Sequence, residues 1–167
     1  MASRKTLRRI DSDFSQTGFT LIEILVVVSL FAVISGLGLI VGMDSYRGYA
    51  FRTDRDTLVS LLQRARSQSV NNICIGACIN GKPHGVFIDA ASGRYILFQG
   101  TTYATRDETS DEITAASFLV GHSGLPEVVF AQLSGDASPI GDIVLFGANG
   151  QISTVSINAV GKISWTN

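Results

Sequence analysis

The sequence predicts an α+β protein in which one long N-terminal helix precedes a domain of antiparallel strands. Three observations support this fold class. The stretch from Phe19 to Met43 is apolar apart from one charged residue, and no proline interrupts residues 19–70. After Asn71, short apolar segments alternate with turns rich in glycine and asparagine, a pattern typical of strands joined by hairpins.

Composition limits the size and class of the protein. A chain of 167 residues with 16% charged residues fits one globular domain with an appended segment, and it is too apolar for a long disordered chain. The net charge of −1 provides no general basic excess for nucleic acid. The charge is unevenly distributed, because residues 1–18 hold four basic and two acidic side chains and the remainder carries a net −3.

The apolar stretch is long enough to cross a bilayer. From Ile24 to Met43 there are twenty uncharged residues, and a helix of this length spans ~30 Å, the thickness of the hydrocarbon core. A secretory signal peptide has a shorter apolar region and a small-residue cleavage site, and a buried core helix would be too apolar for so small a domain. We therefore predict a membrane-spanning helix, and the basic residues before it predict a cytoplasmic N-terminus.

Glu23 is the one charge within this stretch. A carboxylate inside an apolar helix costs ~2.5 kcal/mol or more unless it reaches water, is protonated or finds a cation. The simpler interpretation places it at the headgroup level. The alternative is a free α-amino group, which a cut between Gly18 and Phe19 would create one helical turn away, in the same or a neighbouring molecule.

The helix is expected to continue as an amphipathic segment and to end near Asn71. Apolar residues follow the i, i+3, i+4, i+7 spacing at Leu58, Leu61, Leu62 and Ala65. The charged residues of this segment are expected on the solvated face, and Arg64 and Arg66 are interpreted in the same way, rather than as a basic patch. The sequence is therefore divided into residues 1–18 before the apolar stretch, the apolar stretch 19–43, the amphipathic segment 44–71 and the strand-rich segment 72–167.

Strands are expected at several places in the last segment. The first two flank the turn 90–93, and Asn149-Gly150 is the strongest short hairpin turn. Residues 100–125 are expected to be a long connection with one short strand at 118–120. The expected strands are 86–88, 94–98, 128–131, 143–146, 152–157 and 162–165.

The motif Gly18-Phe19-Thr20-Leu21-Ile22-Glu23, after a short basic leader and before an apolar run, resembles the class III signal of type IV pilins and type II secretion pseudopilins. The resemblance implies that a prepilin peptidase removes residues 1–18 and methylates the new N-terminal Phe19. It implies that Glu23 acts in subunit docking. It further implies an inner-membrane protein that meets other pilin or pseudopilin subunits and an assembly platform, with its C-terminal domain outside the cytoplasm.

The rest of the chain is similar to the H-type minor pseudopilins (the GspH/FimT group) in the helix end 61–69, in the segment leading to residues 86–89 and in the final strands up to Trp165. This implies a pilin-like fold with a two-sheet antiparallel domain. A structural subunit of a pseudopilus or a type IV pilus is the expected function. The alternative is a pilus-associated subunit for DNA uptake or adhesion, which Lys162, as the only cation of residues 161–167, does not favour.

Cys74 and Cys78 form a C-x3-C pair for which three states are open. A disulfide is favoured if the domain lies outside the cytoplasm, and Gly76 would help the loop to turn. Two free buried thiols are the second state. A metal site shared with His84 and His122 is the third, but these histidines lie far apart in the sequence and are interpreted as surface loop residues.

The sequence offers little for catalysis. No nucleophile elbow, phosphate-binding loop or dinucleotide fingerprint occurs, and Ser123 beside His122 is adjacency alone. The acidic segment Asp107, Glu108, Asp111, Glu112 lacks the spacing of an EF-hand and is interpreted as a solvated loop. We therefore expect neither enzyme activity, nor a cofactor, nor a resident metal.

Overall fold

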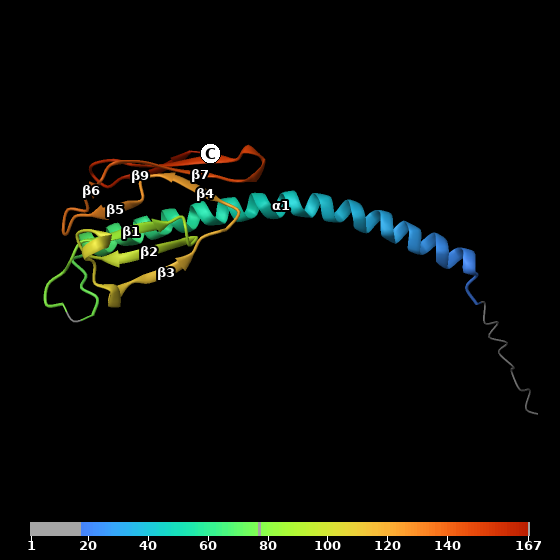
Figure 1. The fold of residues 1–167 in the computed structure, drawn as a ribbon, viewed down its shortest axis with the longest axis horizontal. Coiled ribbons are helices and arrows are strands. Elements are labelled where there is room, and N and C mark those ends of the chain that lie inside the picture. Colours follow the sequence, from blue (N-terminus) through green and yellow to red (C-terminus); the bar gives the residue numbers. More distant parts are fainter. Residues whose placement is uncertain (1–17, 77, 167) are drawn as a thin grey trace, which may run out of the picture. The chain divides into compact units, whose positions relative to one another are not determined.

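The computed structural model describes residues 18–76 and 78–166. One helix, α1, runs from Leu21 to Val70, and the chain divides into two compact units after Val41. The first unit contains the apolar beginning of α1. The second unit contains the rest of α1 and all the strands (Figure 1). The predicted α+β class, a long helix followed by an antiparallel two-sheet domain, is therefore confirmed.

The second unit holds two antiparallel sheets. The first has the order β3-β2-β1-β5-β6 and the second the order β4-β7-β8-β9. The strands are β1 His84–Asp89, β2 Arg94–Gln99, β3 Glu112–Ala115, β4 Gly121–Gly124, β5 Glu127–Phe130, β6 Ala137–Ser138, β7 Gly141–Phe146, β8 Ile152–Ile157 and β9 Ile163–Thr166. The chain crosses from one sheet to the other after β3, after β4 and after β6.

Both predicted hairpins are present, but the second is joined by a different turn from the one expected. β1 and β2 pair from His84↔Gln99 to Asp89↔Arg94, and Gly93 takes a φ of 60° in their turn. β7 and β8 are also neighbours, but a short 3-10 helix, Ala148–Gly150, joins them in place of the expected tight turn. The short apolar segments thus located the strands, whereas the residues Asn149-Gly150 alone did not define the type of turn.

The expected strand at 118–120 is wrong. These residues form a turn in which the Val120 N–H donates to the Ser117 carbonyl, and Phe118 is 88% exposed. The strands of this region lie on either side of the turn, as β3 and β4. β3 pairs with the edge of β2, and β4 pairs with the edge of β7. Both strands depend on these partners, so the sequence around 118–120 alone does not predict them.

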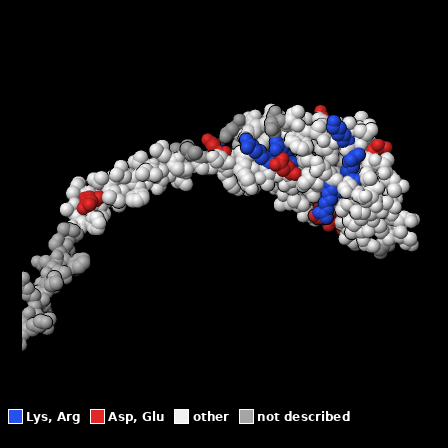
Figure 2. Space-filling view, turned by 180° about the vertical axis from the view of Figure 1, so that it is seen from behind, with Lys and Arg blue, Asp and Glu red and all other residues white. Residues whose placement is uncertain are grey.

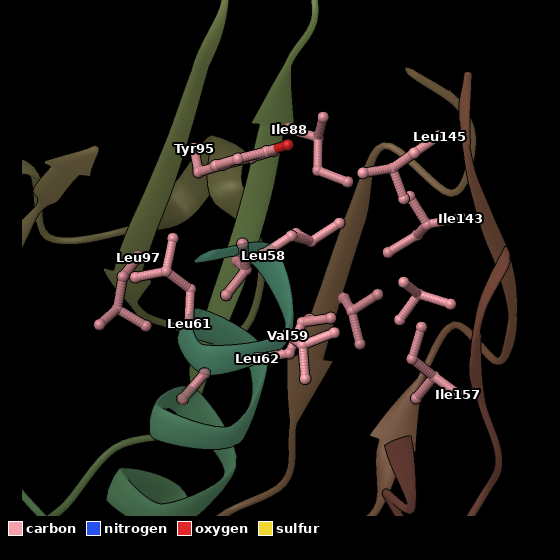
Figure 3. Close-up of a cluster of buried hydrophobic side chains, with 14 of the residues drawn as sticks. Leu58, Val59, Leu61, Leu62, Ile88, Tyr95, Leu97, Ile143, Leu145 and Ile157 are labelled. Atoms are coloured by element: carbon pink, nitrogen blue, oxygen red, sulfur yellow. The ribbon is translucent and has the colours of Figure 1, made fainter. Parts of the chain in front are cut away.

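The core of the second unit lies where α1 meets both sheets. Leu58 and Leu62 are fully buried, and a Leu side chain contributes about 1.5–3 kcal/mol when it is removed from water. Figure 3 shows the helix side chains between residues of β1 and β2 on one side and residues of β7 and β8 on the other. The cluster includes Leu58, Val59, Leu61, Leu62, Ile88, Tyr95, Leu97, Ile143, Leu145 and Ile157.

The first unit is different in character. The described side chains from Leu21 to Leu39 are all exposed, and almost all are apolar. By length and composition this part of α1 qualifies as a membrane-spanning helix. Isolated in water, such a surface would be highly unfavourable, so this half of the helix requires an apolar surrounding.

Candidate functional site

The predicted processing and assembly residues lie at the beginning of α1. Gly18 and Phe19 precede the helix and are exposed, with 77% of Phe19 accessible. The helix begins at Leu21, and Glu23 lies in its first turn. Gly18 and Phe19 are therefore both accessible to solvent. Of the leader that the sequence predicts over 1–18, residues 1–17 lie outside the described residues.

Thr20 determines where the helix starts. Its side-chain Oγ1 and its carbonyl oxygen accept hydrogen bonds from the Glu23 N–H at 3.3 and 3.1 Å. A threonine that caps a helix three residues before a glutamate is the capping-box pattern. Thr20 was not among the expected site residues, although the T-x-x-E spacing is the sequence signal for this role.

The position of Glu23 suits a carboxylate. The first turn of a helix carries the positive end of the helix dipole, which stabilises a negative charge there by roughly 0.3–1 kcal/mol. Figure 2 shows almost no other charge along the helix of the first unit. Glu23 is therefore a single carboxylate on an otherwise apolar stretch of the described helix.

Cys74 and Cys78 are disulfide-bonded in the structure, with Cα atoms 5.9 Å apart. They lie in the connection between α1 and β1. The bridge requires a turn between them, and Gly76 provides it with a φ of 84°, a conformation that favours glycine. Of the three states open to this pair, the arrangement is that of a disulfide.

Gln99 attaches this loop to the domain. Its amide is buried at the end of β2, where Oε1 accepts from the Ile75 N–H at 2.8 Å and Nε2 donates to the Ile75 carbonyl at 3.2 Å. The amide therefore satisfies both backbone groups of Ile75, as a neighbouring strand would. Sequence reasoning gave no role to Gln99, because its partner lies 24 positions away.

Asp54 and His122 meet inside the domain, which corrects two expectations. Asp54 was expected on the solvated helix face and His122 on a surface loop, yet their side chains are only 2% and 6% exposed. Asp54 Oδ2 lies 2.7 Å from the Tyr95 hydroxyl and 3.1 Å from His122 Nε2, and Tyr95 also contacts Nε2. Asp54 Oδ1 accepts from the Ser117 N–H at 2.7 Å.

These contacts explain why a charged residue is tolerated in the core. A buried carboxylate is costly unless donors surround it, and three donors do so here. Burial and the adjacent Asp54 carboxylate raise the pKa of Tyr95 far above its usual range, so the phenol remains protonated and donates. The cluster links α1 to β2 and β4, which belong to different sheets.

His84 is also buried, contrary to the surface position expected for it. It begins β1, is only 1% exposed, and its backbone N–H donates to Ser69 Oγ at 2.8 Å. Burial lowers the pKa of the imidazole, and the nearby Lys82 carbonyl and Gln99 side chain partly offset this effect. His84 is therefore a neutral core residue near physiological pH.

The acidic segment is more ordered than a solvated loop. Arg106 pairs with Asp111 at 2.7 Å and with Glu108 at 3.4 Å, and its guanidinium stacks 3.8 Å from the ring centroid of Tyr103. Asp107 caps a short 3-10 helix by accepting from the Thr109 N–H. Over residues 18–76 and 78–166, no three His, Cys, Asp or Glu side chains gather as metal ligands would.

Arg64 and Arg66, both near the end of α1, differ in their surroundings. Arg64 is exposed and pairs with Glu112 at 2.6 Å, as a solvated face predicts. Arg66 is half-buried, and its Nη2 donates to the Val160 carbonyl at 3.2 Å. The expectation of a solvated face is therefore correct for Arg64 and wrong for Arg66.

Comparisons with known proteins agree with the N-terminal motif. Residues 13–39 match the family model of the prokaryotic N-terminal methylation motif, a range that includes Gly18, Phe19 and Glu23. This match confirms the resemblance to type IV pilins and pseudopilins over that segment. No curated protein matches the chain.

One solved structure of similar fold is the minor pseudopilin EpsH from the Type 2 Secretion System of Vibrio cholerae. The TM-score is 0.47 with 12% sequence identity, over 69% of this chain and 94% of that one.

Proposed function

We propose that this chain is a minor pilin or pseudopilin, a structural subunit of a type II secretion pseudopilus or a type IV pilus. The match of residues 13–39 to the methylation motif carries this proposal. In it, prepilin peptidase cleaves between Gly18 and Phe19 and methylates the new N-terminus. The exposure of both residues before the start of α1 supports the cleavage site.

The membrane delivers the subunit to the filament. The apolar part of α1, residues 19–43, spans the inner membrane with the basic leader in the cytoplasm and the β-rich domain outside. After cleavage the same apolar surface leaves the bilayer and packs against other subunits. Both surroundings remove the exposed side chains of the first unit from water, so one surface serves anchoring and assembly.

Glu23 sets the register of assembly in this proposal. Its carboxylate pairs with the α-amino group of a neighbouring subunit, because a charge in an apolar interface requires a partner. A subunit displaced along the filament would leave both charges unpaired, which is strongly unfavourable. The residue thereby selects one position among many that the apolar surface alone would allow.

The test is production of the full chain with and without a prepilin peptidase, followed by intact-mass measurement. Loss of 18 residues and gain of one methyl group are expected. Gly18→Val should abolish cleavage, whereas Gly36→Val, at another exposed glycine, should not. Recovery of the full-length mass from wild type in the presence of active peptidase would refute the proposal.

Assembly is tested separately from cleavage. Glu23→Gln should be cleaved normally but should be absent from sheared filaments. Glu108→Gln removes an exposed charge from the domain, and its incorporation should match wild type. Equal incorporation of both variants would contradict the role of Glu23.

A further inference from the structure

A groove with two cationic residues lies between α1 and the turn that joins β8 to β9. Its volume is about 460 Å³. The residues that line it are Gln63, Arg66, Val160, Gly161, Lys162 and Ile163. We name it the α1–β9 groove. The cations are Arg66 and Lys162, and Val160 and Ile163 supply apolar wall.

Two glycine turns hold the Arg66 side chain in place. Gly135 and Gly161 have φ values of 71° and 69°. A Cβ atom on Gly161 would lie 2.8 Å from Arg66 Nε, and one on Gly135 would lie 3.4 Å from the same atom. The arginine therefore passes between two backbone segments that only glycine lets approach so closely. Because the side chain is already ordered, binding a ligand costs less conformational entropy.

The guanidinium is positioned but not neutralised. Arg66 donates to the Val160 carbonyl, and its Nε is buried without a hydrogen-bond partner in the described part of the chain. Arg64 and Arg106 both pair with carboxylates. Within residues 18–76 and 78–166, by contrast, neither Arg66 nor Lys162 forms an ion pair. The groove thus presents two uncompensated positive charges, one of which is rigidly held.

We propose that the α1–β9 groove binds an aspartate or glutamate side chain presented by a neighbouring pilin-type subunit. This inference rests on the proposed function. The planar fork of an arginine matches the two oxygens of a carboxylate, and Lys162 adds a second, mobile positive charge. The apolar walls of Val160 and Ile163 fit the methylene groups of such a side chain.

A protein carboxylate fits the groove better than nucleic acid does. Nucleic acid is held by rows of cations along its backbone, frequently with aromatic side chains against the bases. The lining contains two cations and no aromatic residue. Figure 2 shows separate Lys and Arg side chains on the face of the domain seen there, with no continuous positive stripe.

The test is carbodiimide cross-linking of the full-length protein in membranes of cells that also produce its filament partners. A carbodiimide joins a lysine amine to a carboxylate in contact with it. Mass spectrometry should identify a peptide containing Lys162 joined to an Asp or Glu of another subunit with a pilin-type N-terminus. Arg66→Gln should lower the yield by about tenfold, because a charge-assisted bidentate pair is lost.

Two further variants keep the result interpretable. Lys162→Gln changes an exposed side chain and should abolish the product without affecting the fold. Arg52→Gln removes an exposed helix arginine that does not line the groove, and its yield should equal that of wild type. Absence of the product from wild type, or equal yields from Arg66→Gln and Arg52→Gln, would overturn the inference.

Other anions are examined with the full chain in neutral detergent micelles. A 20-nucleotide single-stranded DNA and inorganic phosphate are titrated at constant ionic strength. DNA binding that depends on both Arg66 and Lys162 would overturn the inference and indicate a nucleic-acid site. If micromolar inorganic phosphate alone prevents the cross-link, the inference is also overturned and the groove is a phosphate site. Cleavage by prepilin peptidase distinguishes failure of the proposed function from failure of this inference. A chain that is not cleaved refutes the proposed function, whereas a cleaved chain without the cross-link refutes only this inference.

Discussion

The hydroxyl of Tyr95 on β2 donates a 2.7 Å hydrogen bond to Oδ2 of Asp54 on α1. His122 on β4 approaches the same oxygen at 3.1 Å. One carboxylate therefore holds the helix to a strand of each sheet. This buried polar contact fixes the rotation of the helix about its axis, because a turn of the helix would bury the carboxylate without donors.

Removing the Tyr95 hydroxyl should destabilise the domain. Tyr95→Phe keeps the ring but deprives a buried carboxylate of a donor, which costs about 1.5–3 kcal/mol in the free energy of unfolding. Denaturant unfolding of the full chain in detergent micelles, followed by near-ultraviolet circular dichroism, measures this change. Tyr46→Phe removes the hydroxyl of a tyrosine that is 61% exposed and should change little. Equal effects of the two substitutions would show that the contact does not contribute.

His84 should make the domain sensitive to acid. Burial lowers the pKa of its imidazole in the folded state, so below about 6.5 the unfolded chain binds the proton more readily. Stability is therefore retained above pH 6.5 and decreases as the pH falls toward the folded-state pKa. The slope from this one group cannot exceed ~1.4 kcal/mol per pH unit. Unfolding free energies of wild type and His84→Asn between pH 7 and pH 5 should show a steeper decline for wild type, and parallel curves would contradict this.

Gln99 should protect the disulfide loop from proteolysis. Gln99→Leu leaves the N–H and carbonyl of Ile75 without their partners, so the segment between α1 and β1 opens more often. Digestion with a protease of broad specificity should cut residues 71–83 several-fold faster in this variant. Gln63→Leu changes an exposed glutamine on α1 and serves as the control. If reduction of Cys74–Cys78 accelerates cleavage but Gln99→Leu does not, the disulfide alone restrains the loop.

Alanine substitutions at Gly161 and Gly93 distinguish the cost of backbone strain from the cost of a steric clash. Both have positive φ, so alanine costs about 1 kcal/mol at either position. At Gly93 the added methyl group meets open space, whereas at Gly161 it collides with the Gly135 carbonyl and Arg66. Gly161→Ala should therefore lower the unfolding free energy by clearly more than Gly93→Ala. Equal losses would mean that the turn around Arg66 relaxes without cost.

The sequence predicts those features that depend on neighbouring residues. The absence of proline and the apolar run predicted α1, and short apolar segments bounded by turn residues predicted β1, β2, β7 and β8. β4 was missed because Gly121-His122-Ser123-Gly124 has no strand propensity and forms a strand only by pairing with β7.

The buried polar contacts depend on residues that are distant in the chain. Asp54 is buried because Tyr95 and His122, 41 and 68 positions later, supply donors to it. Arg66 is half-buried because turns at Gly135 and Gly161 close around it. No periodicity within α1 distinguishes these two residues from solvated neighbours such as Arg64, so a helical pattern alone assigns all of them to the polar face.

The three crossings between the sheets affect how the domain can be made. β4 is placed in the second sheet before β5 and β6 complete the first, and β7, β8 and β9 come last in the chain. A nascent chain that stops before β7 therefore leaves β4 without a neighbour and the helix core open on one side. Pairings of such large sequence separation form slowly. The domain becomes a stable folding unit only after its last strands have emerged, because only then is the second sheet complete.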